Sequence, residues 1–101
     1  MVEKQVEVVW TKRSQKQLKK AYERISKDSP KNAIKVIEEI AQAVHKAIPN
    51  PEVYAPDKYK MNNDGSYRAL EKHHYRIVYR FTKNIIRVLR VRHTSMEPLE
   101  Y

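Results

Sequence analysis

The chain has 101 residues, of which 41% are hydrophobic and 33% charged, and its 21 Lys and Arg outnumber 12 Asp and Glu to give a net charge of +9. This composition predicts one folded domain over residues 1–101 rather than a disordered tail. Without cysteine there can be no disulfide, thiol nucleophile or cysteine-based zinc site, and a single glycine excludes glycine-rich phosphate loops. No apolar run is long enough to span a membrane and no signal peptide is visible, so we expect a cytoplasmic protein without cofactor or metal.

The positive charge is concentrated in the first predicted helix and in the last third of the chain. Residues 66–93 contain eight basic side chains and one acid, Glu71. A field of this sign attracts polyanions or an acidic protein partner. The alternative is a basic surface that is only solvated.

The N-terminal half predicts a strand followed by two helices. Residues 2–10 alternate with period two, as in a half-buried strand. Thr11 then offers an N-cap, and the apolar spacing changes to that of a helix. Ser29 followed by Pro30 is a strong start signal for a second helix, whose apolar positions repeat as far as Ile48. Two adjacent amphipathic helices predict an antiparallel hairpin.

The C-terminal half predicts a long loop and three strands. Residues 49–66 show no periodicity and are rich in Pro, Asn and Asp, which indicates a loop. Residues 67–71, 75–81 and 85–92 have the pattern of strands. In the third strand, the alternation predicts Leu89 and Val91 on one face and Val88, Arg90 and Arg92 on the other. The order β-α-α-β-β-β predicts an α+β fold, a helical hairpin on one face of a mainly antiparallel four-stranded sheet.

One face of this sheet is predicted to be cationic. Alternation places Arg76 and Arg80 on one face of their strand, and Arg90 and Arg92 on one face of the neighbouring strand. Such a face either binds an anion or is a solvated strand surface. With Lys58 and Lys60 of the loop, these side chains form a candidate nucleic-acid-binding set: Lys58, Lys60, Arg80, Arg90 and Arg92.

Histidines and tyrosines supply candidate catalytic and stacking groups. His73 and His74 stand together in a predicted turn and His93 ends the last strand, where histidine could act as acid or base or be an ordinary turn residue. No carboxylate is spaced to complete a metal site with them. Tyr22, Tyr75 and Tyr79 lie on apolar stripes and are expected in the core. The four tyrosines in loops or at the end of the chain could stack on unpaired bases: Tyr54, Tyr59, Tyr67 and Tyr101.

Several segments resemble the RelE/ParE superfamily of toxins, found in type II toxin–antitoxin (plasmid stabilisation) modules. They are the basic first helix, the helix break at residues 27–30, the strand at residues 74–80 (HYRIVYR) and the ending at residues 89–98 (LRVRHTSMEP). The resemblance covers nearly the whole chain in the same element order. It implies a toxin neutralised by an antitoxin encoded beside it, and an acidic antitoxin would suit the +9 charge.

The resemblance also implies candidate catalytic residues. Arg76 matches the arginine that contacts the scissile phosphate in RelE-like nucleases, Arg68 a basic residue of the preceding strand, and Tyr101 the C-terminal tyrosine of some members. His93 lies near a C-terminal histidine of some nucleases, and His74 is a further acid or base candidate. The chain departs from the nuclease pattern at Leu70 and Ser95, where basic residues would be expected.

Three functions follow from this resemblance. We expect a ribosome-dependent mRNA endoribonuclease that uses metal-independent acid–base chemistry and inhibits translation, with the ribosome and mRNA as partners. The alternative is a ParE-like inhibitor that binds DNA gyrase and has no nuclease site. An inactive member of the superfamily is the third possibility.

Overall fold

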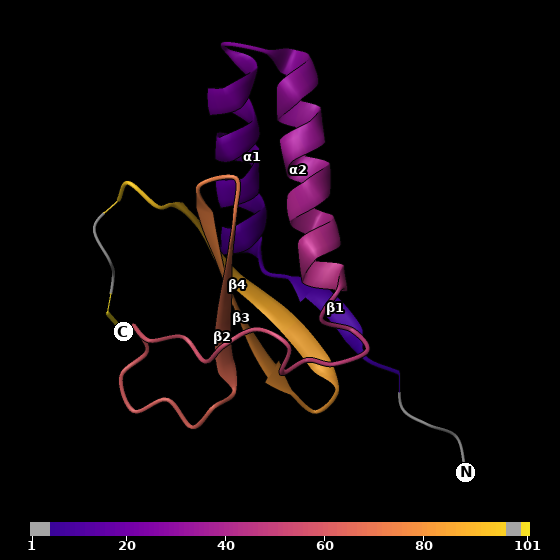
Figure 1. Cartoon of the computed structure of the whole chain (residues 1–101), viewed down its shortest axis with the longest axis vertical. Helices are drawn as coiled ribbons and strands as arrows, with labels where there is room; N and C mark the ends of the chain where they lie inside the picture. The colour runs from indigo at the N-terminus through magenta and orange to yellow at the C-terminus, as the bar shows by residue number, and fades with distance from the viewer. Residues whose placement is uncertain (1–4, 97–99) are drawn as a thin grey trace.

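The computed structural model describes residues 5–96 and 100–101 of the chain. Its elements follow the predicted order: β1 (Glu7–Trp10), α1 (Lys12–Ser26), α2 (Pro30–His45), β2 (Tyr67–Lys72), β3 (Tyr75–Thr82) and β4 (Ile85–His93). The two helices stand side by side in the upper part of the view, and most of the sheet lies below them (Figure 1). The predicted α+β class is confirmed. Residues 2–4 of the predicted first strand, and Glu97 and Pro98 of the family-like ending, lie outside the described residues.

Both helices begin at the predicted caps. The Thr11 hydroxyl accepts a hydrogen bond from the Ser14 N–H at 3.2 Å, and the Ser29 hydroxyl accepts one from the Asn32 N–H at 3.1 Å. Each cap satisfies one of the amide donors that a helix leaves free in its first turn. The second helix ends at His45, one turn before the predicted end near Ile48, and Pro49 prevents its continuation.

The sheet has the strand order β1-β4-β3-β2, with β1 parallel to β4 and the other pairs antiparallel. Its helix-facing side forms the core with α2, and Ile40, Ile77, Tyr79, Ile86 and Val88 are all fully buried. Tyr22, by contrast, is predicted to lie in the core but is 38% exposed on α1. The Tyr22 side chain lines the groove between the two helices and does not pack against the sheet.

The predicted alternation in β4 is wrong at one point. Val78 pairs with Arg90, but the next residue, Tyr79, pairs with Val88, so Leu89 is an extra residue in a β-bulge. The bulge turns Val88 onto the core face together with Val91, although both cannot share a face in a regular strand. The three arginines of β4 then lie on the face of the sheet that points away from the helices. On that face each is paired with a residue of β3: Arg87 with Arg80, Arg90 with Val78, and Arg92 with Arg76.

Two tight turns join the last three strands. His73 and His74 have φ angles of 53° and 67°, and Lys83 and Asn84 have φ angles of 51° and 62°. Positive φ at both central residues is the geometry of a type I′ hairpin turn, which Asn-Gly adopts most easily. The histidine pair is therefore held in a backbone conformation that costs about 1–3 kcal/mol for each such residue.

Candidate functional site

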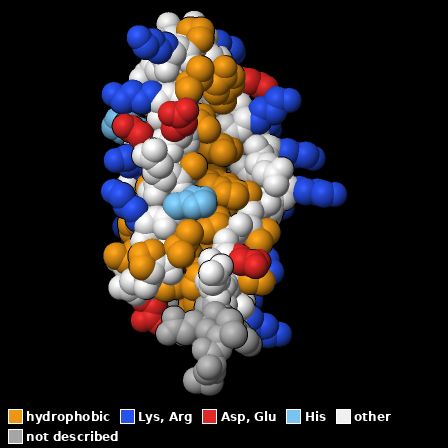
Figure 2. Space-filling model, turned by 90° about the vertical axis from the view of Figure 1, so that its right-hand side faces the viewer, with side chains coloured by type: hydrophobic (Ala, Val, Ile, Leu, Met, Phe, Trp, Pro, Cys, Tyr) orange, Lys and Arg blue, Asp and Glu red, His pale blue; other side chains and the backbone are white. Residues whose placement is uncertain are grey.

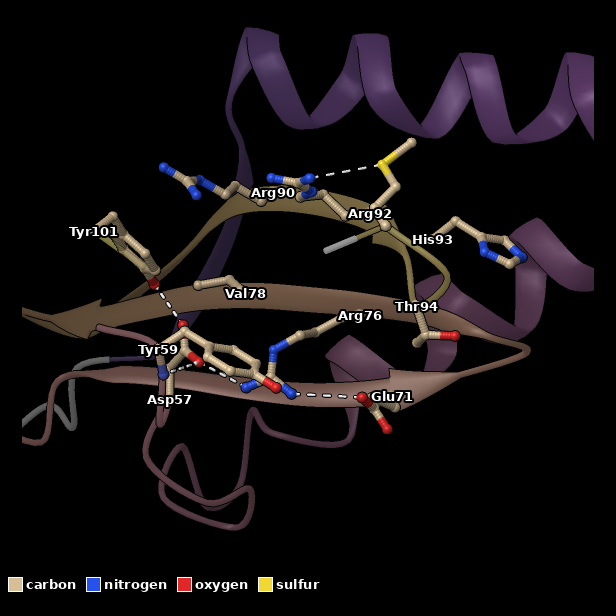
Figure 3. Close-up of a pocket in the computed structure, with 11 residues that line it drawn as sticks. Asp57, Tyr59, Glu71, Arg76, Val78, Arg90, Arg92, His93, Thr94 and Tyr101 are labelled. Carbon is tan, nitrogen blue, oxygen red and sulfur yellow. Dashed lines mark hydrogen bonds and ion pairs between the residues drawn. The ribbon is translucent and has the colours of Figure 1, made fainter. Parts of the chain in front are cut away.

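The candidate site is a pocket on the face of the sheet that points away from the helices, over β3 and β4 (Figure 3). The loop before β2 and Tyr101 cover part of this face, so the cationic side of the sheet is less open than the alternation alone indicates. Arg76 and Arg90 enter the pocket from neighbouring strands, and Asp57 and Tyr59 enter from the loop. The remaining lining residues are Glu71, Val78, Arg92, His93, Thr94, Met96 and Tyr101.

A buried carboxylate organises the pocket. Asp57 is 2% exposed, and its Oδ1 accepts a hydrogen bond from the Arg76 guanidinium at 2.6 Å and one from the Tyr59 N–H at 3.2 Å. Its Oδ2 accepts a hydrogen bond from the Tyr101 hydroxyl at 2.6 Å. Burial opposes ionisation of Asp57, but the hydrogen bonds from Tyr101 and Arg76 outweigh it and lower the pKa of the carboxyl. Asp57 is therefore an anion that neutralises Arg76.

Arg76 is held on several sides. Its guanidinium lies 4.8 Å from the centre of the Tyr59 ring, and a second nitrogen lies 3.6 Å from the Glu71 carboxylate. Among the described residues, its Nε is buried and has no hydrogen-bond partner. The side chain thus keeps one free donor, while its charge is compensated by Asp57.

Tyr101 is fixed by contacts to the sheet and the loop. Arg90 lies 4.3 Å from its ring centre, and Tyr67 packs against the ring edge-to-face at 6.0 Å. Its backbone N–H donates to Tyr59 O at 3.1 Å. Burial, together with the hydrogen bond to Asp57, raises the pKa of the Tyr101 hydroxyl. A phenol in this setting is a poor proton donor or base near neutral pH.

His93 lies at the other end of the pocket from Asp57 and Tyr101 (Figure 3). The Ser95 N–H donates to His93 Nδ1 at 3.0 Å, so that nitrogen acts as an acceptor and carries no proton. Partial burial, with the positive charge of Arg24 and the neighbouring His74, lowers the pKa of His93. His74 stacks on His93 with ring centres 6.4 Å apart and does not line this pocket.

Arg68 lies on the opposite face of the sheet from Arg76. It pairs with Tyr79, whose side chain is in the core, whereas Arg76 pairs with Glu71. The Arg68 guanidinium donates to Tyr54 O at 2.9 Å, and to Glu52 O and Gly65 O. The structure thus brings Arg76, His93 and Tyr101 to one pocket but leaves Arg68 and His74 outside it.

Of the predicted nucleic-acid-binding residues, Arg90 and Arg92 line the pocket. The others lie against tyrosine rings: Lys58 lies 5.2 Å from the Tyr59 ring centre, Lys60 4.9 Å from that of Tyr67, and Arg80 4.7 Å from that of Tyr67. Of the four tyrosines predicted to stack on bases, Tyr59, Tyr67 and Tyr101 therefore pack against cations of this chain, whereas Tyr54 packs edge-to-face on Tyr79. Their ability to stack on bases stays a prediction.

The sequence pattern does not mark Asp57 as a functional candidate, and it marks Tyr59 only as a tyrosine that could stack on an unpaired base. Both lie in the aperiodic loop, where nothing in the pattern distinguishes a buried residue from an exposed one. The one signal is chemical, because a predicted row of sheet arginines requires a counter-charge and the loop supplies Asp57.

Within residues 5–96 and 100–101, no cluster of three or more His, Asp or Glu side chains has the arrangement of a metal site. In the same ranges, neither helix combines the length and the apolar character that crossing a membrane requires.

Comparison with known proteins identifies the family. The model of the ParE toxin of the type II toxin–antitoxin system parDE matches residues 8–98. A solved structure described as a chromosomal ParDE toxin–antitoxin system from P. aeruginosa superposes with a TM-score of 0.70, at 17% identity, over 88% of this chain and 96% of that chain. No protein with a curated description matches. The structural likeness supports the fold, and the family match extends over nearly all of the sequence: the chain belongs to the ParE family of type II toxin–antitoxin toxins.

Proposed function

We propose that this ParE family toxin arrests growth by binding DNA gyrase rather than by cutting RNA, and that a cognate antitoxin neutralises it. The observation that carries this proposal is the contact of Arg76 with Asp57. A nuclease arginine must offer its charge to a phosphate in the transition state. Here the guanidinium already has a buried carboxylate 2.6 Å away, and phosphate would have to compete with it.

The other candidate catalytic groups support the same proposal. Tyr101 donates to the same carboxylate, so its proton is engaged inside the protein. Arg68 binds loop carbonyl groups on the other face of the sheet. General acid–base catalysis requires the acid, the base and the charge-stabilising group within hydrogen-bond reach of one substrate, and this arrangement does not supply that set.

The helical hairpin of this chain offers an apolar surface to which an antitoxin can bind. The groove between α1 and α2 is lined by apolar side chains, including Trp10 and Ile37, and Ile34 beside it is 50% exposed. Figure 2 shows hydrophobic side chains running up the middle of this view, with Lys and Arg along both margins. An amphipathic antitoxin segment with acidic flanks would match both features.

The endoribonuclease is the second candidate, because Arg76, Arg90, Arg92, His93 and Tyr101 share one pocket. It requires that ribosome-bound RNA displace Asp57 from Arg76. A double variant, His93→Gln with Tyr101→Phe, separates the two candidates while leaving the charge of the arginine face intact.

The test is induced expression of the wild-type chain and this variant in a bacterium, with mRNA ends mapped alongside plasmid supercoiling. Gyrase inhibition predicts growth arrest by both proteins, intact messages, and relaxed plasmid or gyrase-trapped breaks. Cleavage within translated codons by the wild type, reduced about 100-fold or more in the variant, would instead establish the nuclease. No growth arrest by soluble, folded wild-type chain would indicate an inactive member.

A further inference from the structure

The outward face of α1 carries a row of exposed cations that neither the family match nor the pocket accounts for. The helix contains six basic residues and one acid, Glu23. Three of the cations, Lys16, Lys20 and Arg24, follow one another at four-residue spacing, and Lys12 continues the row towards the N-terminus. All four are exposed.

Among the described residues, these cations have no counter-ion, in contrast to Arg76 and Arg80 of the sheet. Arg76 and Arg80 each have a carboxylate within 4.0 Å, whereas among residues 5–96 and 100–101 no ion pair involves a basic residue of α1. The lysines of the loop lie against tyrosine rings, as does Arg90. The exposed charge of α1 is thus available to an external anion.

At its C-terminal end the row continues into a groove between α1 and β4. Lys20 and Arg24 line this groove from the helix, and Arg92 and His93 line it from the strand. The described lining includes no Asp or Glu: its other members are Gln17, Ala21, Tyr75, Val91 and Met96. Three cations and the His93 imidazole, from two elements, therefore border a groove whose described lining contains no acid.

The spacing fits a regular polyanion. Four residues of α-helix advance about 6 Å, so the row from Lys12 to Arg24 spans about 18 Å. Because a nucleic-acid strand winds around its axis, the direct separation of neighbouring phosphates is close to this step of about 6 Å between cations, so successive cations can meet successive phosphates. A protein partner would instead require apolar contact area, and the apolar groove of this hairpin lies on another side of α1, beside Tyr22.

We propose that the α1 row, Lys12, Lys16, Lys20 and Arg24, together with Arg92 across the groove, binds the phosphodiester backbone of nucleic acid without reading its sequence. The row gives the toxin an electrostatic contact of its own with DNA or RNA. It is independent of the gyrase proposal, because a chain that binds DNA and leaves gyrase active would retain this surface.

The experiment measures binding of the purified full-length chain to two fluorescent probes, a DNA duplex of arbitrary sequence and a single-stranded RNA, by anisotropy over a series of salt concentrations. The test variant is Lys16→Gln with Lys20→Gln and Arg24→Gln. The matched control removes the same charge from exposed positions at the ends and outer side of α2, Lys31→Gln with Lys35→Gln and Lys46→Gln. Glutamine is a good helix former, so both triples should keep their helices, which circular dichroism verifies.

The wild type should bind at about 100 mM salt, with an affinity that falls steeply as salt rises. The α1 triple should bind about tenfold or more weakly, and the slope of log K against log salt should decrease by about 0.9 for each DNA phosphate that the variant no longer neutralises. The α2 triple should stay within about threefold of the wild type. Tighter binding of the duplex or of the RNA identifies the source of the phosphate.

Three results would overturn the proposal. One is no binding of either probe at about 100 mM salt. A second is an equal loss of affinity in both triples, which would mean that only total charge matters. The third is equally tight binding of polyglutamate with the same dependence on the α1 cations, which would indicate an acidic-protein surface.

Discussion

Arg76 on β3 donates a 2.6 Å hydrogen bond to Asp57, which lies nineteen residues earlier in the loop before β2. The carboxylate is fully buried, and the Tyr101 hydroxyl donates to its other oxygen. One acid thus joins the central part of the sheet, the long loop and the last residue of the sequence. The cationic face of the sheet is organised around this contact.

Asp57→Asn should destabilise the fold. Removing one partner of a buried ion pair leaves the other charge uncompensated, which costs about 3–5 kcal/mol, and the 21% exposure of the Arg76 side chain lowers this to about 2–3 kcal/mol. Urea unfolding measures the difference. Asp64→Asn is the matched control, because that carboxylate is exposed and lies 4.0 Å from Arg80. Equal unfolding midpoints for the two variants would contradict the role assigned to Asp57.

The same carboxylate should give the protein an acid-labile component of stability. The pKa of Asp57 is lowered in the folded state, so the unfolded state binds more protons and stability falls as pH decreases. The contribution is fully present above the unfolded value of about 3.9 and is lost as pH falls below it, through the folded pKa. Unfolding free energies of the wild type and Asp57→Asn should therefore converge towards low pH. A difference that stays constant down to about pH 2 would contradict this linkage.

Tyr79→Phe tests the buried hydroxyl under the loop. Tyr79 is fully buried, its hydroxyl donates to Pro51 O at 2.6 Å, and burial raises its pKa to about 12. Loss of the hydrogen bond should cost about 1 kcal/mol near neutral pH. Because the folded pKa is raised, the stabilisation from neutral Tyr79 is present below pH of about 10 and is lost as pH rises towards 12. The variant should lose less stability than the wild type over this range, as measured by unfolding at each pH.

Replacing His73-His74 by Asn-Gly should stabilise the chain by about 1 kcal/mol. Both histidines have positive φ, and Asn-Gly adopts the type I′ turn with less strain. The replacement removes the contact of His73 with Glu39 on α2, which is exposed and therefore weak. Thermal unfolding measures the gain. Under the gyrase proposal growth arrest should be unchanged, whereas loss of arrest in a stable variant would assign a functional role to this histidine pair.

Most of the fold could be predicted because its local signals agree. Thr11 and Ser29 are helix caps in both sequence and structure, and the alternation of β3 holds over its whole length. The prediction is wrong in β4, where Leu89 is an extra residue. A bulge of this kind depends on pairing with the neighbouring strand, which the β4 sequence alone does not encode.

The site is less predictable than the fold. Arg76, His93 and Tyr101 share one pocket, as the family resemblance implies, but the sequence does not reveal the groups that hold them. Asp57 and Tyr59 lie in a loop whose path is fixed by interactions with distant residues, such as the hydrogen bond from the Asp57 N–H to Tyr67 O. Such long-range interactions leave no periodic pattern in the sequence, so the path of the loop cannot be predicted from it. The direction of Arg68, away from Arg76, depends on strand register in the same way.

The most direct measurement is supercoiling of relaxed plasmid by purified gyrase in the presence of increasing amounts of the purified chain, with a parallel reaction on ribosome-bound mRNA. We predict dose-dependent loss of supercoiling or accumulation of gyrase-trapped cleaved plasmid, with the mRNA left intact. Normal supercoiling together with cleavage of the mRNA within codons would contradict the gyrase proposal and assign the pocket around Arg76 to catalysis.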